Sequence, residues 1–291
     1  MATPAEKAMA SGWNIDLVMV DGAVEAATLL DNMKTMRTRH VREDDIFICT
    51  FPKSGTHWVW EIVNMIVAGK PTYAKHWQNV SWLDCRTEQE IDALPSPRII
   101  HTQRRPGQLP KDIWKFKSKV IYVNRNPKDA AVSTFSQASK QVWKDNPAGK
   151  FTFTGTWDEF VILYQDGCAP FGSILEHERQ WRNVTDIDVC RVQFEELKQD
   201  SVSIVKRLAE YLERPLSEET YRQIAEACGF ENLKQASEKI KDQTYHNNWN
   251  QGSSGYFRKG QSGEWKKWFT VAQSERFDRL YEETLNEKFP Y

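Results

Sequence analysis

The chain has 291 residues, 40% of them hydrophobic, and 39 Lys and Arg against 40 Asp and Glu give a net charge of −1. This composition is typical of a globular protein with a substantial core. It excludes an overall basic field that would attract nucleic acid or an anionic membrane, so basic residues that matter for function must act locally.

The cysteines and the hydropathy pattern indicate a cytoplasmic protein. The five cysteines are odd in number and form no C-x-x-C pair, which predicts reduced thiols rather than a disulfide or zinc framework. No apolar stretch is long enough for a signal peptide or a membrane-spanning helix. No His, Cys or carboxylate cluster has the spacing of metal ligands, so no metal is expected.

In chain order, the first strong signal is a strand at residues 45–51 followed by a helix at residues 56–67. Further strands are predicted at residues 98–102, 119–124 and 188–194, and further helices at residues 127–139, 201–213 and 217–227. This alternation predicts one α/β domain over residues 1–291, with a parallel central sheet flanked by helices on both faces. Ligands of such sheets bind at the carboxyl ends of the strands.

The segment T-F-P-K-S-G-T-H-W, residues 50–58, joins the first strand to its helix and has the features of an anion-binding loop. Backbone N–H groups and the helix dipole converge there, Gly55 permits close approach, and Lys53 adds a positive charge. The Walker A motif G-x-x-x-x-G-K-[ST] is absent. The loop therefore resembles a P-loop in its position, but an ATPase or a classical kinase is disfavoured. The alternative is that the segment is only a turn.

Two further segments favour an anion site over a turn. N-R-N-P-K-D, residues 124–129, follows a predicted strand and supplies Arg125, whose planar guanidinium suits a phosphate. Y-F-R-K-G-Q-S-G-E-W-K-K-W, residues 256–268, is rich in glycine and carries Arg258 and Lys259. Three such segments on one sheet indicate a shared anion site.

Together these segments resemble the cytosolic sulfotransferase family. T-F-P-K-S-G-T-H-W is similar to its 5′-phosphosulfate loop, V-N-R-N-P-K-D-A-A-V-S to its 3′-phosphate motif, and R-K-G-Q-S-G-E-W-K to its C-terminal signature. The resemblance covers nearly the whole chain. It implies an enzyme that moves the sulfonate of 3′-phosphoadenosine 5′-phosphosulfate (PAPS) to a hydroxyl of a small acceptor by in-line displacement, leaving the bisphosphate product PAP and using no metal.

The resemblance also implies the residues around PAPS, which are Lys53, Ser54, Gly55, Thr56, His57, Trp58, Arg125, Ser133, Phe194, Cys228, Phe230, Arg258, Lys259 and Gly260. Among them, Lys53 stabilises the leaving phosphate, Ser133 restrains premature hydrolysis, and Trp58 and Phe230 flank the adenine. His57, Phe194 and Cys228 differ from the residues that are common in the family, but none of these differences removes a phosphate contact.

The catalytic base departs from the family pattern. The family has a His in a stretch similar to S-P-R-L-I-K-T-H-L-P, whereas residues 96–105 read S-P-R-I-I-H-T-Q-R-R, which puts Gln103 at that position. Gln cannot accept a proton at neutral pH. His101 lies two residues earlier, on the same face of an extended strand, and is the candidate substitute base. The alternatives are that His101 only lines the pocket or has no role. His177 and the remaining histidines outside the loop are expected at the surface.

Aromatic and basic residues outside the cofactor motifs indicate the acceptor pocket. The predicted pocket residues are Trp77, Trp82, Arg104 and Trp143. The tryptophans suit a flat aromatic acceptor, and a positive charge at Arg104 suits an acceptor that is or becomes anionic, so a phenol or enol is favoured. A PAP- or PAPS-binding protein with lost catalysis and a PAPS-dependent dehydratase remain alternatives. Lys266, Thr270, Val271 and Glu275 match a short family pattern, K-x-x-x-T-V-x-x-x-E, that implies a homodimer.

Overall fold

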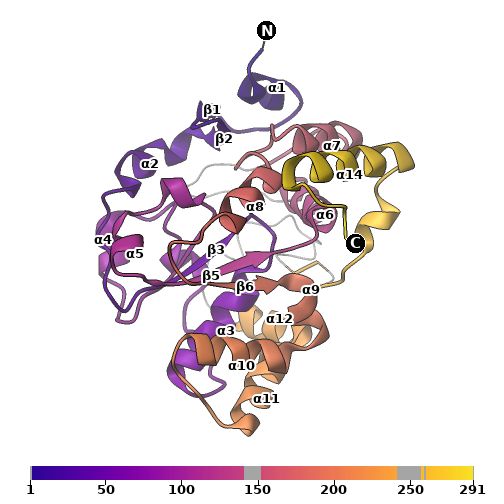
Figure 1. Ribbon diagram of the computed structural model, residues 1–291. Coiled ribbons are helices and arrows are strands. Elements are labelled where there is room, and N and C mark those ends of the chain that lie inside the picture. Colours follow the sequence, from indigo (N-terminus) through magenta and orange to yellow (C-terminus); the bar gives the residue numbers. More distant parts are fainter. Residues whose placement is uncertain (1, 141–151, 241–256, 259, 291) are drawn as a thin grey trace.

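The central sheet has four parallel strands in the order β4-β3-β5-β6 (Figure 1). The computed structural model describes residues 2–140, 152–240, 257–258 and 260–290. The strands are Ile46–Thr50 (β3), Ile99–Thr102 (β4), Lys119–Asn124 (β5) and Val189–Gln193 (β6). The predicted α/β fold with a parallel sheet is therefore confirmed. Both central strands are continuous apolar runs because helices cover them on both sides.

Helices cover both faces of the sheet, as Figure 1 shows. On one face, Ile48 and Ile121 pack in a core shared with α3 (Thr56–Ala68), α10 (Ser201–Tyr211) and α11 (Glu218–Ala227). On the other face, Phe47 and Tyr122 pack against Trp181 of α8 (Ile174–Arg182). Three more helices lie on that side, α6 (Pro127–Ala138), α7 (Trp157–Gln165) and α14 (Val271–Leu285). Alternate strand residues thus serve two separate cores.

The sequence pattern did not predict the N-terminal hairpin. Strands β1 (Leu17–Val20) and β2 (Ala23–Ala26) pair antiparallel and lie beside α1 (Pro4–Ala10). The remaining elements are short: η1 (Ala27–Leu29), α2 (Leu30–Met36), η2 (Gln78–Ser81), α4 (Glu88–Asp92), η3 (Pro106–Gln108), α5 (Asp112–Lys115), α9 (Phe194–Gln199), α12 (Phe230–Lys239) and η4 (Glu264–Lys267). Within the part of the chain that the structure describes, no helix is both long enough and apolar enough to cross a membrane.

Candidate active site

The loop between β3 and α3 is built for close approach of a ligand to its backbone. Lys53 and Gly55 have φ angles of +67° and +104°, so the chain turns sharply before α3 begins at Thr56. The hydroxyls of Thr50 and Thr56 lie 2.6 Å apart and tie the two ends of the loop together. A Cβ on Gly55 would lie 2.9 Å from the ring of Phe194, so this position needs glycine for both its φ and its space.

Arg125, at the carboxyl end of the neighbouring strand β5, joins this loop. Its guanidinium donates to the carbonyl of Lys53 over 2.9 Å and lies 4.3 Å from the centre of the Phe194 ring. The next residue, Asn126, caps α6 by accepting from the N–H groups of Lys128 and Asp129. Two of the three predicted anion-binding segments therefore meet at one edge of the sheet.

Asp129, for which no role was predicted, attaches the third segment to α6. The carboxylate of Asp129 accepts from the backbone N–H groups of Gly263 and Trp265 over 2.6 and 3.0 Å. Gly260, with φ +59°, lies so close to Phe230 that a Cβ would be 2.3 Å from its ring. Asp129 is part of the motif N-R-N-P-K-D, but an acidic residue in the first turn of a helix did not by itself point to this contact.

Positive charge is concentrated at this meeting point, where Arg125 is buried and Lys53 and Arg258 are half-buried. Desolvation, together with the charges of Arg125 and Arg258, lowers the pKa of Lys53 to about 7. Ser54 Oγ and Arg125 Nε are buried and have no hydrogen-bond partner among the described residues. Such an arrangement favours a ligand with several negative charges, because the ligand would satisfy the donors and offset the repulsion.

The other predicted cofactor residues are spread around this centre. Trp58 lies edge-on to Phe194 at 5.5 Å, and Ser133 is half-buried on α6. Cys228 is fully buried in the core, where its thiol is 3.7 Å from the sulfur of Met65. Lys259 lies outside the described residues.

On strand β4, His101 is buried and its tautomer is fixed by one contact. Its Nε2 lies 3.0 Å from the backbone carbonyl of Gln78, and because a carbonyl only accepts, Nε2 carries the hydrogen. Nδ1 therefore keeps its lone pair, and it is buried without a partner among the described residues. The ring of Trp82 stacks on the imidazole at 6.0 Å. Burial lowers the pKa of His101 to about 4, whereas the Asp84 carboxylate acts in the opposite direction.

His57 connects the anion-binding loop to this second group. Its ring lies 4.0 Å from that of Trp77, and its Nε2 is 3.3 Å from Ser237 Oγ. Burial, together with the charges of His101 and Lys53, lowers the pKa of His57 to about 3. His57 is therefore neutral and within electrostatic reach of both His101 and the loop lysine.

Asp84 holds the segment that follows β4. Its carboxylate accepts from the backbone N–H of Gln103 over 3.2 Å and from the guanidinium of Arg104. The amide oxygen of Gln103 is buried and has no partner within the described part of the chain. Arg104 is 1% exposed and also pairs with Glu25 over 2.6 Å. Its charge is thus balanced by two carboxylates, and the structure does not provide the unpaired positive charge that was predicted at Arg104.

Two other predicted positions have different outcomes. His177 was expected at the surface, which is wrong: it is 1% exposed on α8 and packs against Phe51 and Tyr122 at 5.5 and 5.8 Å. Helical spacing places His177 on the inner side of α8 with Ile174 and Trp181, and its polar neighbour Glu178 is buried as well. Trp143 lies outside the described residues.

Comparisons with known proteins agree with this architecture. The sulfotransferase domain family matches residues 43–289. Mouse sulfotransferase 2B1 is 34% identical over 92% of this chain and 78% of its own length, and human sulfotransferase 1E1 is 34% identical over 88% of each. The crystal structure of mouse sulfotransferase SULT7A1 with PAP is 28% identical, covers 93% of this chain and 95% of that one, and has a TM-score of 0.76. A retinol dehydratase structure with retinol and PAP, at 17% identity, has a TM-score of 0.81 over 100% of this chain and 97% of that one, which shows the fold alone.

The geometry at the two ends of α3 predicts unequal effects of two glycine substitutions. Gly69 follows the last residue of α3, and Gly69→Ala introduces a side chain at φ +68° with no atom within 4 Å of its Cβ. We expect this change to lower the free energy of unfolding by about 1 kcal/mol. Gly55→Ala adds the contact with Phe194 to a similar φ penalty, so we expect a further loss of about 1–3 kcal/mol. Urea unfolding of the two variants measures the difference. Equal losses would contradict the close contact at Gly55.

Proposed function

Because this chain belongs to the sulfotransferase domain family, we propose a specific base and acceptor class for its reaction. The chain is a sulfotransferase that uses PAPS, and it moves the sulfonate to a hydroxyl of a small acceptor. The proposed acceptor is an aromatic compound with a hydroxyl of low pKa, a phenol or an enol. His101 accepts the proton of that hydroxyl at Nδ1.

The buried donors and charges of the loop support the fit to PAPS. When bound, PAPS supplies the sulfonate, which passes to the acceptor oxygen as its bond to the phosphate oxygen breaks. Lys53 and the backbone N–H groups of Gly55 and Thr56 would hold the negative charge of the 5′ end, whereas the N–H of Ser54 donates to the carbonyl of Phe51. The 3′-phosphate would contact Arg125, Ser133, Arg258, Lys259 and Gly260. Trp58 and Phe230 provide faces for the adenine.

The observation that carries the base assignment is the hydrogen bond from His101 to the Gln78 carbonyl. It orients the ring and keeps the lone pair of Nδ1 available, which are the two requirements for a general base. Gln103 Oε1 can accept a hydrogen bond from the same hydroxyl and hold it in place, although it cannot take the proton. Gln103 is therefore a substrate-positioning group in this proposal.

The depressed pKa of His101 supports an acidic acceptor. A base with a pKa of about 4 is neutral at pH 7 but has little driving force to deprotonate an alcohol. A phenol or enol gives up its proton far more readily. Trp77 lies against His57 and Trp82 stacks on His101, and these two rings are the proposed stacking surfaces for a planar compound.

Assembly and location are also part of the proposal. Val271 opens α14 and is 75% exposed, and the hydroxyl of Thr270 caps the helix by accepting from the N–H of Gln273. An exposed apolar side chain on a rigid helix start supports a homodimer contact that includes Lys266 and Glu275. All five cysteines are free thiols, which supports a cytoplasmic location.

The pKa of Lys53 predicts proton uptake when PAP binds. In the free enzyme this pKa is about 7, so at pH 8 most of the lysine is neutral, and the phosphates of PAP raise its pKa in the complex. Binding at pH 8 should therefore take up close to one proton, and the affinity should fall as pH rises above about 7. Calorimetry in two buffers of different ionisation enthalpy measures the uptake. Lys53→Arg, which stays charged, should bind without it; equal uptake by both proteins would refute the assignment.

The base assignment predicts the outcome of removing the imidazole. His101→Ala should lower kcat by about 10²–10⁴ with an aliphatic alcohol, less with an acidic phenol, and leave PAP affinity unchanged. Because the base must be neutral, wild-type kcat should rise with pH through about 4 and then level off, and this rise should be absent in the variant.

A rescue variant controls for indirect damage. Gln103→His in the His101→Ala background should restore part of the activity by putting an imidazole at the neighbouring position. Steady-state assays with labelled PAPS measure both variants. Nearly full activity of His101→Ala on every acceptor would show that His101 is only pocket lining.

The exposed start of α14 predicts a dimer that one charge disrupts. Val271→Glu should convert a concentration-dependent dimer into a monomer without loss of the unfolding free energy, because the side chain is exposed in the single chain. Ile162→Glu on α7, where the side chain is 52% exposed, is the matched control and should leave the dimer intact. Sedimentation at micromolar concentrations measures the mass. A wild type that is monomeric throughout would end this part of the proposal.

A further inference from the structure

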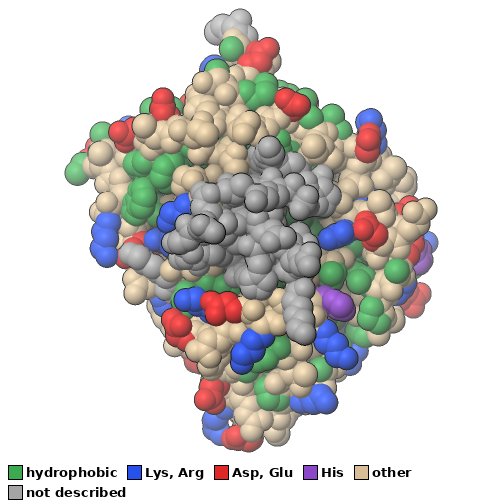
Figure 2. Space-filling view, turned by 180° about the vertical axis from the view of Figure 1, so that it is seen from behind, with side chains coloured by type: hydrophobic (Ala, Val, Ile, Leu, Met, Phe, Trp, Pro, Cys, Tyr) green, Lys and Arg blue, Asp and Glu red, His purple; other side chains and the backbone are tan. Residues whose placement is uncertain are grey.

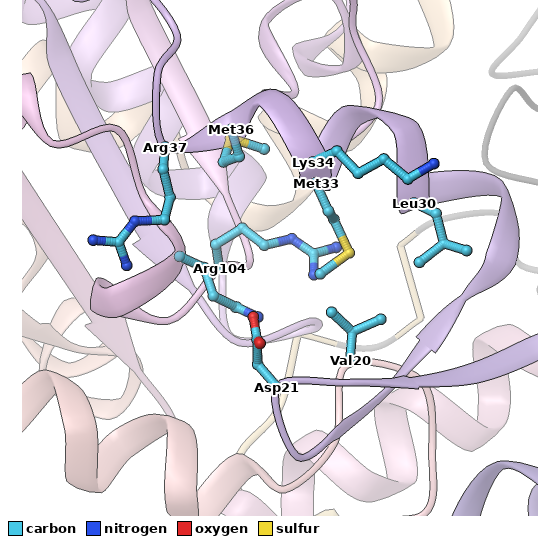
Figure 3. A pocket seen from close by; sticks show the side chains of 9 residues that line it. Val20, Asp21, Leu30, Met33, Lys34, Met36, Arg37 and Arg104 are labelled. Atoms are coloured by element: carbon cyan, nitrogen blue, oxygen red, sulfur yellow. The ribbon is translucent and has the colours of Figure 1, made fainter.

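A cavity of about 210 Å³ lies between strand β1 and helix α2, and Arg104 forms part of its lining (Figure 3). Its apolar wall is formed by Val20 at the end of β1 and by Leu30, Met33 and Met36 of α2. An engineered cavity of about 150 Å³ already admits benzene, so this volume accommodates a six-membered ring with one substituent. The cavity is separate from the anion-binding loop, since none of its lining residues belongs to the loop.

Two hydrogen-bond donors of the cavity lining have no acceptor among the described residues, Arg104 Nη2 and Gln108 Nε2. Arg104 is 1% exposed, and its Nη1 is 3.4 Å from the sulfur of Met33, so the guanidinium extends along the floor of the cavity (Figure 3). The amide of Gln108 has a defined orientation because its oxygen accepts from the N–H of Arg105. A buried donor without an acceptor is unfavourable, and a ligand oxygen that accepts from it would remove this cost.

The charges around the cavity decide between a neutral and an anionic ligand. Arg104 is already balanced by two carboxylates, and Lys34 pairs with Asp31 over 2.8 Å. Arg37 donates to the carbonyl of Gly107, and Asp21 adds a further negative charge to the lining. When Asp31, Glu25 and Asp84 are counted with the lining residues they pair with, positive charge is not in excess. A carboxylate or phosphate gains little there, whereas a neutral oxygen can accept from the two donors.

We infer that this cavity binds a small neutral molecule with an apolar ring or chain and one carbonyl or hydroxyl oxygen. We also infer that this binding shifts Gln103 and thereby changes the affinity for the hydroxyl acceptor. The coupling follows from shared contacts. One carboxylate, that of Asp84, holds both the Arg104 side chain and the Gln103 backbone, so a ligand that draws on the guanidinium acts on the residue beside the proposed base. Only this coupling rests on the proposed function; binding does not.

Two methionine methyl groups allow the site to be tested directly in the full chain with PAP bound. Cyclohexanone is the neutral probe, and cyclohexanecarboxylate is the anionic one. We expect cyclohexanone to shift the ¹³C-methyl signals of Met33 and Met36 saturably, with a Kd on the order of millimolar for so small a molecule. The methyl of Met65, which is buried in a different core, should not move. Absence of saturable shifts, or tighter binding of the carboxylate, would overturn the inference.

Three variants complete the test. Val20→Phe fills the cavity and should abolish the shifts, whereas Met19→Phe, on the neighbouring outward-facing position of β1, should not. Gln108→Glu keeps the oxygen that accepts from Arg105 but removes the donor, and should weaken cyclohexanone about fivefold or more.

The coupling has its own readout. Saturating cyclohexanone should change the KM for the hydroxyl acceptor about twofold or more in the wild type and not in Val20→Phe. If the cyclohexanone-induced shifts of Met33 and Met36 persist when the hydroxyl acceptor is saturating, the cavity is a site separate from the acceptor pocket. If the acceptor abolishes them, a separate site is refuted. An unchanged KM despite confirmed binding would refute the coupling.

Discussion

Repulsion among partly buried cations around the β3–α3 loop is the interaction on which the rest of the site depends. Arg125 is buried and Lys53 is half-buried, and Arg258 lies close enough to depress the pKa of the lysine. Like charges in a dry environment are costly, and carboxylates offset only part of this cost: Asp129 and Glu195 raise the pKa of Arg125 against the effect of burial. Lys53, Arg125 and Glu195 follow the carboxyl ends of three strands, β3, β5 and β6. A polyanion is the ligand that such a centre is prepared to receive.

The proposed acceptor side of the site is neutral, in contrast to the charged loop. His57 and His101 are both buried beside tryptophan rings, and burial holds both imidazoles in the neutral form. In the proposed function, these rings hold a planar apolar compound with one hydroxyl at a defined place. The boundary between the charged half and the dry half lies at His57, the residue where the loop departs from the usual pattern. A charged region that suits a polyanion thus adjoins a neutral, apolar region that suits the proposed acceptor.

Figure 2 shows the molecule from behind, with Lys, Arg, Asp and Glu interspersed over the visible surface rather than gathered by sign. The ion pairs that organise the site are instead buried. Asp84 is fully buried and joins Gln103, Arg104 and the side chain of Asn32, while Glu25 reaches Arg104 from β2. Breaking such a pair leaves an uncompensated charge in the interior, which costs about 3–5 kcal/mol. The N-terminal hairpin is thereby fixed to the acceptor side, although it belongs to neither the sheet nor the loop.

The sequence by itself determined the parallel sheet, because the strands at residues 45–51 and 119–124 are apolar on both faces and alternate with amphipathic helices. It also identified the loop at residues 50–58 and Arg125, since a glycine, a lysine and an arginine at strand ends are local features of the chain. Tertiary structure decided which charges are free. Arg104 has the same sequence signature as a ligand-binding arginine, but Glu25, which lies 79 positions away in the numbering, neutralises it. His177 resembled a surface residue, and the packing of α8 buried it. The availability of the His101 lone pair likewise depends on a carbonyl from another segment, because a side chain's protonation and partners are set by neighbours that only the fold brings together.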